Sequence, residues 1–347
     1  MKLPTPVARL LLRLSTWLLQ IAAVAGMVEL IGGGWDIMWH IRHVPEFFWT
    51  PPHIVLYSGA GVVLLARGAA FVLRWSGRSY PRSVRAGTAI AFAGAVLQFA
   101  AGGFDSAWHA RFGADDSLSP PHVMLTAAMV ITTLGIVLAL HAWRRMEAAG
   151  GVRRASAWVA HAVSVTAMTW ATWGLLFILL FPGLFRTNVL VEPFGLRLFT
   201  AAAFAGLLPL MVLTSARVVG RRGAATLSAA VQAGGALLIT GLMGDLDPMT
   251  APFAALFVLP GVLADLLYRP DSRGSLYVAI ALGAILAQFA FLTGGVVDAM
   301  TRPDLIPVAA ALAYAAGGVV AAILAERIGS AAEGLGAEPA GPAPVPA

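Results

Sequence analysis

The chain has 347 residues, of which 59% are hydrophobic and only 12% are charged, and its mean hydropathy is +0.81. A soluble domain carries about twice that share of charged residues, so these values exclude a soluble globular protein and indicate a membrane protein. The net charge of +6 does not indicate a nucleic-acid surface, because its arginines lie in short loops, where they orient membrane helices.

Long apolar runs separated by short polar loops predict an all-α fold, a polytopic transmembrane helical bundle of about ten helices. The N-terminal segment has the basic start and apolar run of a signal peptide. That run continues without a convincing cleavage site, so we expect it to be retained as the first helix. The expected helices cover residues 7–43, 51–75, 86–111, 120–146, 155–181, 194–219, 225–244, 250–268, 275–299 and 305–327.

Arginine-rich loops follow the second, fourth, sixth and eighth expected helices, and the N-terminal segment is also basic. The intervening loops are poorer in arginine and carry acids and prolines. The positive-inside rule then places both termini in the cytoplasm. We therefore expect a multi-pass protein of the cell membrane whose partner is the lipid bilayer, with no nucleic-acid partner and with a homo-oligomer or partner subunits left open.

One segment of the chain occurs twice, at an offset of 69 residues. Both copies read Gly-Gly-aromatic-Asp-x-x-Trp-His followed by Pro-Pro-His, with the two histidines 13 positions apart. The offset spans two expected helices, so the copies share one orientation and predict a parallel tandem repeat in helices 1–4. The polar residues common to both copies are Asp36, His40 and His53 in the first and Asp105, His109 and His122 in the second.

The spacing within each copy is that of a metal-ligand set. Residues four apart lie on one face of a helix, so Asp36 and His40 can point at one ion. His53 follows two prolines, which suit the first turn of the return helix, and it therefore lies beside the end of the preceding helix. The chain has no cysteine, so nitrogen and oxygen must hold any metal. Two imidazoles and a carboxylate suit copper, with zinc or non-haem iron as alternatives.

Two simpler interpretations compete with a metal site. Asp/His pairs also cap helix ends or hydrogen-bond each other, and any duplication copies its spacing. However, neighbouring positions have changed between the copies, as when Ile37 is replaced by Ser106, whereas the ligand-type residues are retained. A haem bound between His40 and His109 is a further alternative, and the aspartate four residues before each histidine argues against it.

The Asp-x3-His-x12-His pattern, at the end of one membrane helix and the start of the next, resembles the copper motif in the C subunit of particulate methane and ammonia monooxygenases. The resemblance covers about residues 20–146 and maps that family's first site onto Asp36, His40 and His53. The second site maps onto the second copy, where Asp105 replaces the family's asparagine. It implies copper and oxygen chemistry on a small apolar or amine substrate. Helices 5–10 have no counterpart there, and the family's A and B subunits and cupredoxin domain are absent from this chain.

The expected organisation has three regions: a tandem two-hairpin metal-binding membrane region at 1–146, a six-helix membrane scaffold region at 147–330 and a disordered tail at 331–347. The expected function is an integral membrane copper-binding protein with two Asp/His/His sites at the extracytoplasmic ends of helix hairpins, either an oxygen-activating monooxygenase-like enzyme or a subunit of one. A copper or zinc carrier or storage protein, or a purely structural metal site, is the alternative. Pseudo-two-fold packing of the hairpins would bring both sets into one cavity.

Four further residues are candidates to support the ligands. Glu29 lies seven positions before Asp36, on the same helix face, and Gln98 is its copy. They either orient ligands or make polar contacts between helices. Trp39 and Trp108 either wall the site or belong to an aromatic belt at the membrane surface. Gly33 and Gly34, with their copies, are expected to let neighbouring backbones approach closely.

Overall fold

The computed structural model describes residues 5–42, 48–75, 81–113, 118–149, 155–180, 206, 209–246, 250–267 and 307–335. Within these ranges every regular element is helical, which confirms the predicted all-α class. Five of these helices are long and apolar enough to cross a membrane. The predicted helix at 275–299 lies outside the described residues, as do most of residues 194–208 and the end of the tail at 336–347.

The helices follow the apolar runs closely, and two of them begin at the Pro-Pro pairs. Proline is favoured in a first turn, where its missing N–H is not needed. The last helix continues to Leu335, into the segment expected to be disordered, because residues 331–333 are strong helix formers, Ala-Ala-Glu. The elements are α1 (Thr5–Ile41), α2 (Pro51–Trp75), α3 (Arg82–Phe112), α4 (Pro120–Ala149), α5 (Ala155–Leu180), the π-helical turn η2 (Ser215–Val219), α7 (Ala224–Leu242), α8 (Thr250–Leu267) and α11 (Pro307–Leu335).

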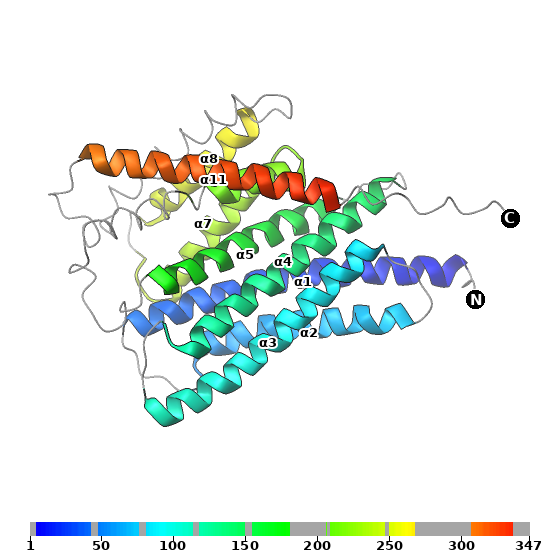
Figure 1. Ribbon diagram of the computed structural model, residues 1–347, viewed down its shortest axis with the longest axis horizontal. Helices are drawn as coiled ribbons and strands as arrows, with labels where there is room; N and C mark the ends of the chain where they lie inside the picture. Colours follow the sequence, from blue (N-terminus) through cyan, green and yellow to red (C-terminus); the bar gives the residue numbers. More distant parts are fainter. Residues whose placement is uncertain are drawn as a thin grey trace.

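The first five helices lie side by side as a bundle (Figure 1). α1 pairs with α2 and α3 pairs with α4 as antiparallel hairpins, and α5 packs against both α1 and α4. The last turns of α1 and α3 and the first turns of α2 and α4 meet at one end of the bundle, on the left in Figure 1. The ligand-type residues of both copies therefore lie at the same end of the bundle.

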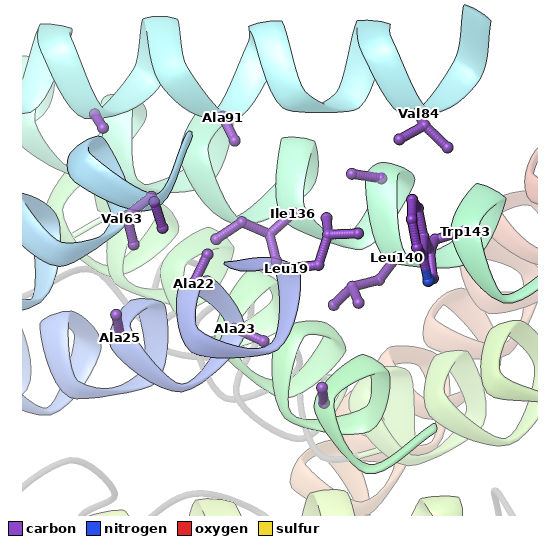
Figure 2. Packing of buried hydrophobic residues seen from close by; sticks show 14 residues of the cluster. Leu19, Ala22, Ala23, Ala25, Val63, Val84, Ala91, Ile136, Leu140 and Trp143 are labelled. Atoms are coloured by element: carbon purple, nitrogen blue, oxygen red, sulfur yellow. The ribbon is translucent and has the colours of Figure 1, made fainter. Parts of the chain in front are cut away.

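Small side chains fill the centre of this bundle (Figure 2). Ala22 and Ala23 of α1, Ala91 of α3 and Ala139 of α4 are fully buried there, around the larger Ile136. Small residues let helix backbones approach closely, which is the main source of contact energy between helices in lipid. The core therefore fixes the spacing of the hairpins that carry the site.

Several close backbone contacts use glycines other than those predicted. A Cβ at Gly59 would lie 2.6 Å from the backbone nitrogen of Glu29, and one at Gly87 would lie 2.5 Å from that of Ala139. Gly33 instead faces the side chain of Met129, and Gly34 faces that of Ile239. In the second copy, Gly102 faces the Tyr57 side chain and Gly103 has nothing within 4 Å. The prediction for these four glycines was wrong because sequence does not reveal which helix each glycine faces.

Candidate metal centre

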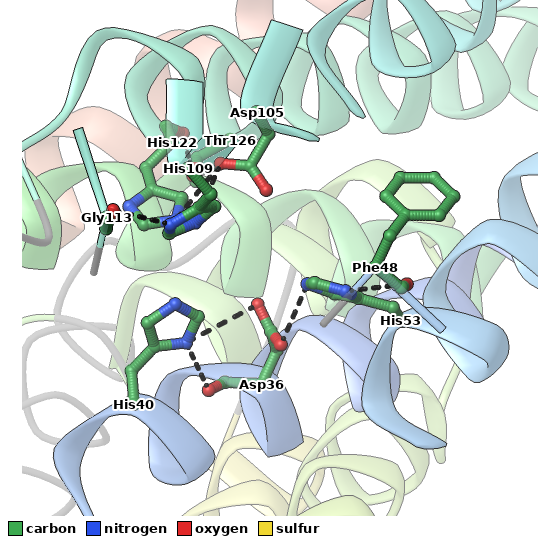
Figure 3. A network of polar contacts seen from close by, with 9 residues as sticks. All are labelled: Asp36, His40, Phe48, His53, Asp105, His109, Gly113, His122 and Thr126. Carbon is green, nitrogen blue, oxygen red and sulfur yellow. Dashed lines mark hydrogen bonds and ion pairs between the residues drawn. The ribbon is translucent and has the colours of Figure 1, made fainter. Parts of the chain in front are cut away.

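The predicted ligands lie at the end of the bundle where the two hairpins meet (Figure 3). Asp36 and His40 occupy the last two turns of α1, and His53 is the third residue of α2. α3 and α4 place the second copy in the same way. The side chains of both aspartates are buried, although the residues stand near helix ends. Ionisable groups in such apolar surroundings require a charged or hydrogen-bonding partner.

In the first hairpin the carboxylate of Asp36 lies between two imidazoles. Its Oδ1 is 3.2 Å from Nε2 of His53, and its Oδ2 is 3.9 Å from Nδ1 of His40. Nδ1 of His40 also lies 2.9 Å from the backbone carbonyl oxygen of Asp36. The i,i+4 spacing and the Pro-Pro-His turn thus bring together the three residues that the sequence predicts.

In the second hairpin one carboxylate oxygen lies close to both imidazoles. Oδ1 of Asp105 is 3.5 Å from Nε2 of His109 and 3.5 Å from Nε2 of His122. The two imidazole ring centroids are 6.1 Å apart. Both Nε2 atoms thus face the same oxygen.

Ligand-type residues of the two hairpins lie next to one another. The ring centroids of His40 and His122 are only 5.1 Å apart, and those of His40 and His109 are 6.5 Å apart. One ligand nitrogen from each of these three residues lies within 4.8 Å of the other two. Three imidazoles from three helices therefore form one cluster that could hold a metal ion, and Asp105 borders it.

Hydrogen bonds to backbone carbonyls fix the tautomers of three of the four histidines. Nδ1 lies 2.9 Å from the Asp36 carbonyl oxygen in His40, 3.0 Å from that of Phe48 in His53, and 3.0 Å from that of Gly113 in His109. A carbonyl oxygen only accepts, so Nδ1 carries a hydrogen, and in the neutral ring Nε2 keeps a lone pair. Metal-binding histidines are held in this way, with the second ring nitrogen donating to a carbonyl or carboxylate.

Gly113 supplies one of these carbonyls through a backbone conformation that other residues rarely adopt. Its φ is +77°, and its N–H donates to the carbonyl oxygen of His109 at 2.9 Å. Its own carbonyl then accepts from Nδ1 of the same histidine. Glycine reaches positive φ at little steric cost, so it is the residue suited to end α3 in this way.

In these tautomers the Nε2 atoms and the carboxylate oxygens that face them are all hydrogen-bond acceptors. Nε2 of His53 and Nε2 of His109 lie 3.2 and 3.5 Å from a carboxylate oxygen, and in the neutral rings each would direct a lone pair at it. Two acceptors at such distances repel each other unless a cation or a proton lies between them. Around a tetrahedral ion with bonds of about 2.0–2.1 Å, ligand nitrogens lie about 3.3 Å apart. The cluster therefore has the right donors for such an ion, and coordination would require these side chains to move inward.

A largely apolar cavity of about 60 Å³ adjoins the cluster. Its walls combine ligand-type residues with aliphatic and aromatic side chains of α1, α2, α4 and α5. α5 contributes Trp170 and Gly174, although sequence reasoning assigned this helix to the scaffold region. No sequence signal separates these residues from others in an apolar helix. The lining comprises Leu30, Gly33, Gly34, Asp36, Ile37, His40, Leu56, His122, Leu125, Thr126, Met129, Trp170, Ala171, Gly174 and Ile178.

The candidate supporting residues occupy two different places. Glu29 and Gln98 are fully buried, and their side chains face each other in the interior, two helical turns from the aspartates. Trp39 packs edge to face on Trp35, with ring centroids 6.1 Å apart. Trp108 packs between Phe104 and Phe112, at 5.8 and 4.4 Å. These aromatic contacts thus lie within the ends of α1 and α3 that carry the ligand-type residues, whereas Glu29 and Gln98 form a contact between helices.

The segment 43–47, which contains His43 and Glu46, lies outside the described residues. Tyr57, which the sequence analysis did not select, stacks on Phe48 with centroids 5.6 Å apart and lies 6.0 Å from His53. It is four residues after His53 in α2 and thus on the same helix face. That spacing was the signal that could have identified it.

Comparison with protein-family models, with curated proteins and with solved structures finds no match to this chain. The site is therefore interpreted from its own geometry and chemistry.

Proposed function

We propose that the chain is an integral membrane protein that binds one copper ion in a centre shared by its first two helix hairpins. The observation that carries this proposal is the cluster of His40, His109 and His122, whose ligand nitrogens lie within 4.8 Å of one another. Asp105 is placed to supply a fourth ligand. Imidazole ligands suit copper, zinc and iron, and copper binds most tightly among the divalent metals of this series.

The same proposal covers the parts of the chain that surround the centre. In this proposal the chain has about ten membrane helices, with a parallel tandem repeat in the first four. Both termini lie in the cytoplasm and the centre faces the extracytoplasmic side. Support comes from the alternating arginine content of the loops and from the 69-residue offset of the two motif copies.

The described side chains have separate tasks in this centre. His40, His109 and His122 would bind the ion through Nε2, with Nδ1 of His40 and His109 held by backbone carbonyls. Asp36 would orient His53 at the edge of the centre, where the two are 3.2 Å apart. A bound copper ion supplies one-electron redox chemistry and a Lewis acid, and the protein keeps the surroundings of that ion apolar.

A second candidate function, oxygen-dependent oxidation of a small apolar or amine substrate, is favoured by the adjoining cavity. Its lining joins His40 and His122 directly to apolar side chains such as Met129 and Trp170. A pocket with few polar groups beside a metal is the usual form of a small-molecule site. The resemblance of the motif to the copper monooxygenase C subunit supports the same chemistry.

Metal analysis of the purified protein tests the binding proposal. We expect copper in the wild type and a loss of most of it in the Asp36→Ala/Asp105→Ala variant, because Asp105 faces Nε2 of His122 and Asp36 lies beside the ring of His40. His141→Asn, in the same helix as His122 but at its opposite end, is the control and should keep its copper. Unchanged copper in the double aspartate variant would contradict the assignment.

The oxidase proposal has its own measurement. Copper-loaded protein given a reductant and either a short alkane or ammonia should consume oxygen faster than the Asp36→Ala/Asp105→Ala variant. Copper binding without substrate-dependent oxygen uptake would instead indicate a carrier or storage protein. A protein that retains zinc in place of copper would favour a carrier or a structural site.

A further inference from the structure

Glu29 is an acidic residue in the interior of a membrane-spanning helix. It lies in the part of α1 that is long and apolar enough to cross a bilayer, and it is fully buried. Neither oxygen of its carboxyl meets strict hydrogen-bond geometry with a described donor, and the side chain that faces it is that of Gln98. An ionisable residue inside a membrane span is expensive to keep charged, and it marks a site by default. The metal centre does not use Glu29, so the carboxyl requires a separate explanation.

The side chain of Glu29 is fully buried, and the Asp, Glu, Lys and Arg residues described in α1 to α4 stand about two or more helical turns away along their helices. Gly59 of α2 packs directly on its backbone, and the polar group that faces its carboxyl is the side chain of Gln98 in α3. At a rise of about 1.5 Å per residue, Asp36 on α1 lies about 10 Å further along its helix, as Asp105 does from Gln98. Arg67, on α2, lies about 12 Å along its helix from Gly59. On α4 the facing residue is Thr132, and the histidines of that helix are nine or more positions away.

Hydrogen bonding fixes the orientation of the Gln98 amide. The Thr132 hydroxyl donates to the carbonyl oxygen of Ala128 at 2.8 Å, so its oxygen can only accept from Gln98, which lies 2.7 Å away. The atom of Gln98 that faces Thr132 is therefore Nε2. This leaves Gln98 Oε1, which is also buried and has no hydrogen-bond partner, together with the two oxygens of Glu29. Three buried acceptors share one site, and only one amide hydrogen remains to serve them.

We propose that Glu29 and Gln98 form a proton-binding site between the two hairpins, in which the Glu29 carboxyl is held as the neutral acid. Its O–H donates to Gln98 Oε1, and the second Nε2 hydrogen of Gln98 donates back to the other Glu29 oxygen. Every donor and acceptor from Glu29 through Thr132 to the Ala128 carbonyl then has a partner. The bound proton removes a charge that the membrane interior does not tolerate, and the resulting pair of hydrogen bonds connects α1 to α3.

The proposal is independent of the metal centre and can be tested without metal. Infrared spectra of the purified full-length protein should contain the carbonyl stretch of a protonated carboxylic acid at neutral pH, persisting into the alkaline range. Glu29→Gln, which keeps the size of the side chain, should lose this band. Asp36→Asn should retain it. Gln98→Leu removes the hydrogen-bond acceptor and should shift the band to higher wavenumber.

Three outcomes would contradict the proposed proton-binding site of Glu29 and Gln98. A spectrum in which Glu29→Gln removes no acid band means that Glu29 is ionised in the folded protein. A band that disappears when sodium chloride replaces potassium chloride at constant pH means that the three oxygens hold a sodium ion. A band that Gln98→Leu leaves at its original wavenumber means that Gln98 is not the partner of the acid.

Discussion

Replacing Gly59 by alanine should force α1 and α2 apart just inside the metal centre. An added Cβ would lie 2.6 Å from the backbone nitrogen of Glu29 and 2.7 Å from the carbonyl oxygen of Ala25. Ordinary contact begins at 3.4 Å, so the helices would have to separate by about 0.8 Å. The opposing atoms belong to a helix backbone and cannot rotate away, which makes this contact less forgiving than one with a side chain.

The expected cost follows from two opposing effects. Overpacking of a well-packed interior costs about 1–3 kcal/mol, and alanine recovers up to about 1 kcal/mol over glycine within a helix. Because the opposing atoms are backbone, the upper part of that overpacking range, about 2–3 kcal/mol, applies, and after the alanine gain Gly59→Ala should reduce the free energy of unfolding by about 1–2 kcal/mol. Gly103 is the matched control, because a Cβ there has nothing within 4 Å, and its change to alanine should be neutral or stabilising.

Thermal unfolding in detergent, monitored through the helical circular dichroism signal, measures the stability of both variants. We expect the Tm of Gly59→Ala to fall below that of the wild type and the Tm of Gly103→Ala to equal or exceed it. The separation of α1 from α2 should also move His53 away from Asp36, at 3.2 Å in the wild type. A Gly59→Ala protein as stable as the wild type would refute the close approach of these helices.

Three further predictions concern residues outside the ligand cluster. Arg42→Gln removes an exposed ion pair with Asp245 that ties the end of α1 to the segment after α7. It should lower stability by at most about 1 kcal/mol, and an effect that does not shrink in high salt would contradict an electrostatic origin. Gly174→Ile should fill the cavity and abolish xenon binding without loss of metal, and retained xenon binding would place the cavity elsewhere. His141→Asn should leave metal content unchanged, because His141 packs on His161, and a loss of metal would make it part of the centre.

The motif identified the ligand-type residues because helix geometry is local. Asp36 and His40 are four residues apart and therefore share a face of α1, and the Pro-Pro pair marks where α2 begins. Pseudo-two-fold packing predicts that both sets enter one cavity, but the grouping of His40 with His109 and His122 depends on how closely one hairpin packs against the other, which the sequence does not give. The sequence indicates two equal sets of three, whereas the described geometry forms one cluster of three imidazoles drawn from both hairpins.

Features that depend on the facing helix were also beyond the sequence. Trp170 and Gly174 lie in a helix that is apolar on every side, so no periodicity marks the face that lines the cavity. Gly59 makes a backbone contact, whereas Gly103 faces open space, although both are glycines of membrane helices. The hydrogen bonds of His53 and His109 go to backbone carbonyls between the two helices of each hairpin. They depend on the path of that connection, on which the ligand pattern contains no information.

The number of metal ions bound by His40→Asn tests the shared centre most directly. The wild type should hold one copper ion per chain, and His40→Asn should lose it, because His40 joins His109 and His122 in one cluster. Circular dichroism of the metal-free proteins would establish that the variant is folded. Two ions in the wild type, with one retained in His40→Asn, would instead mean that each hairpin binds its own ion, and would contradict the shared centre.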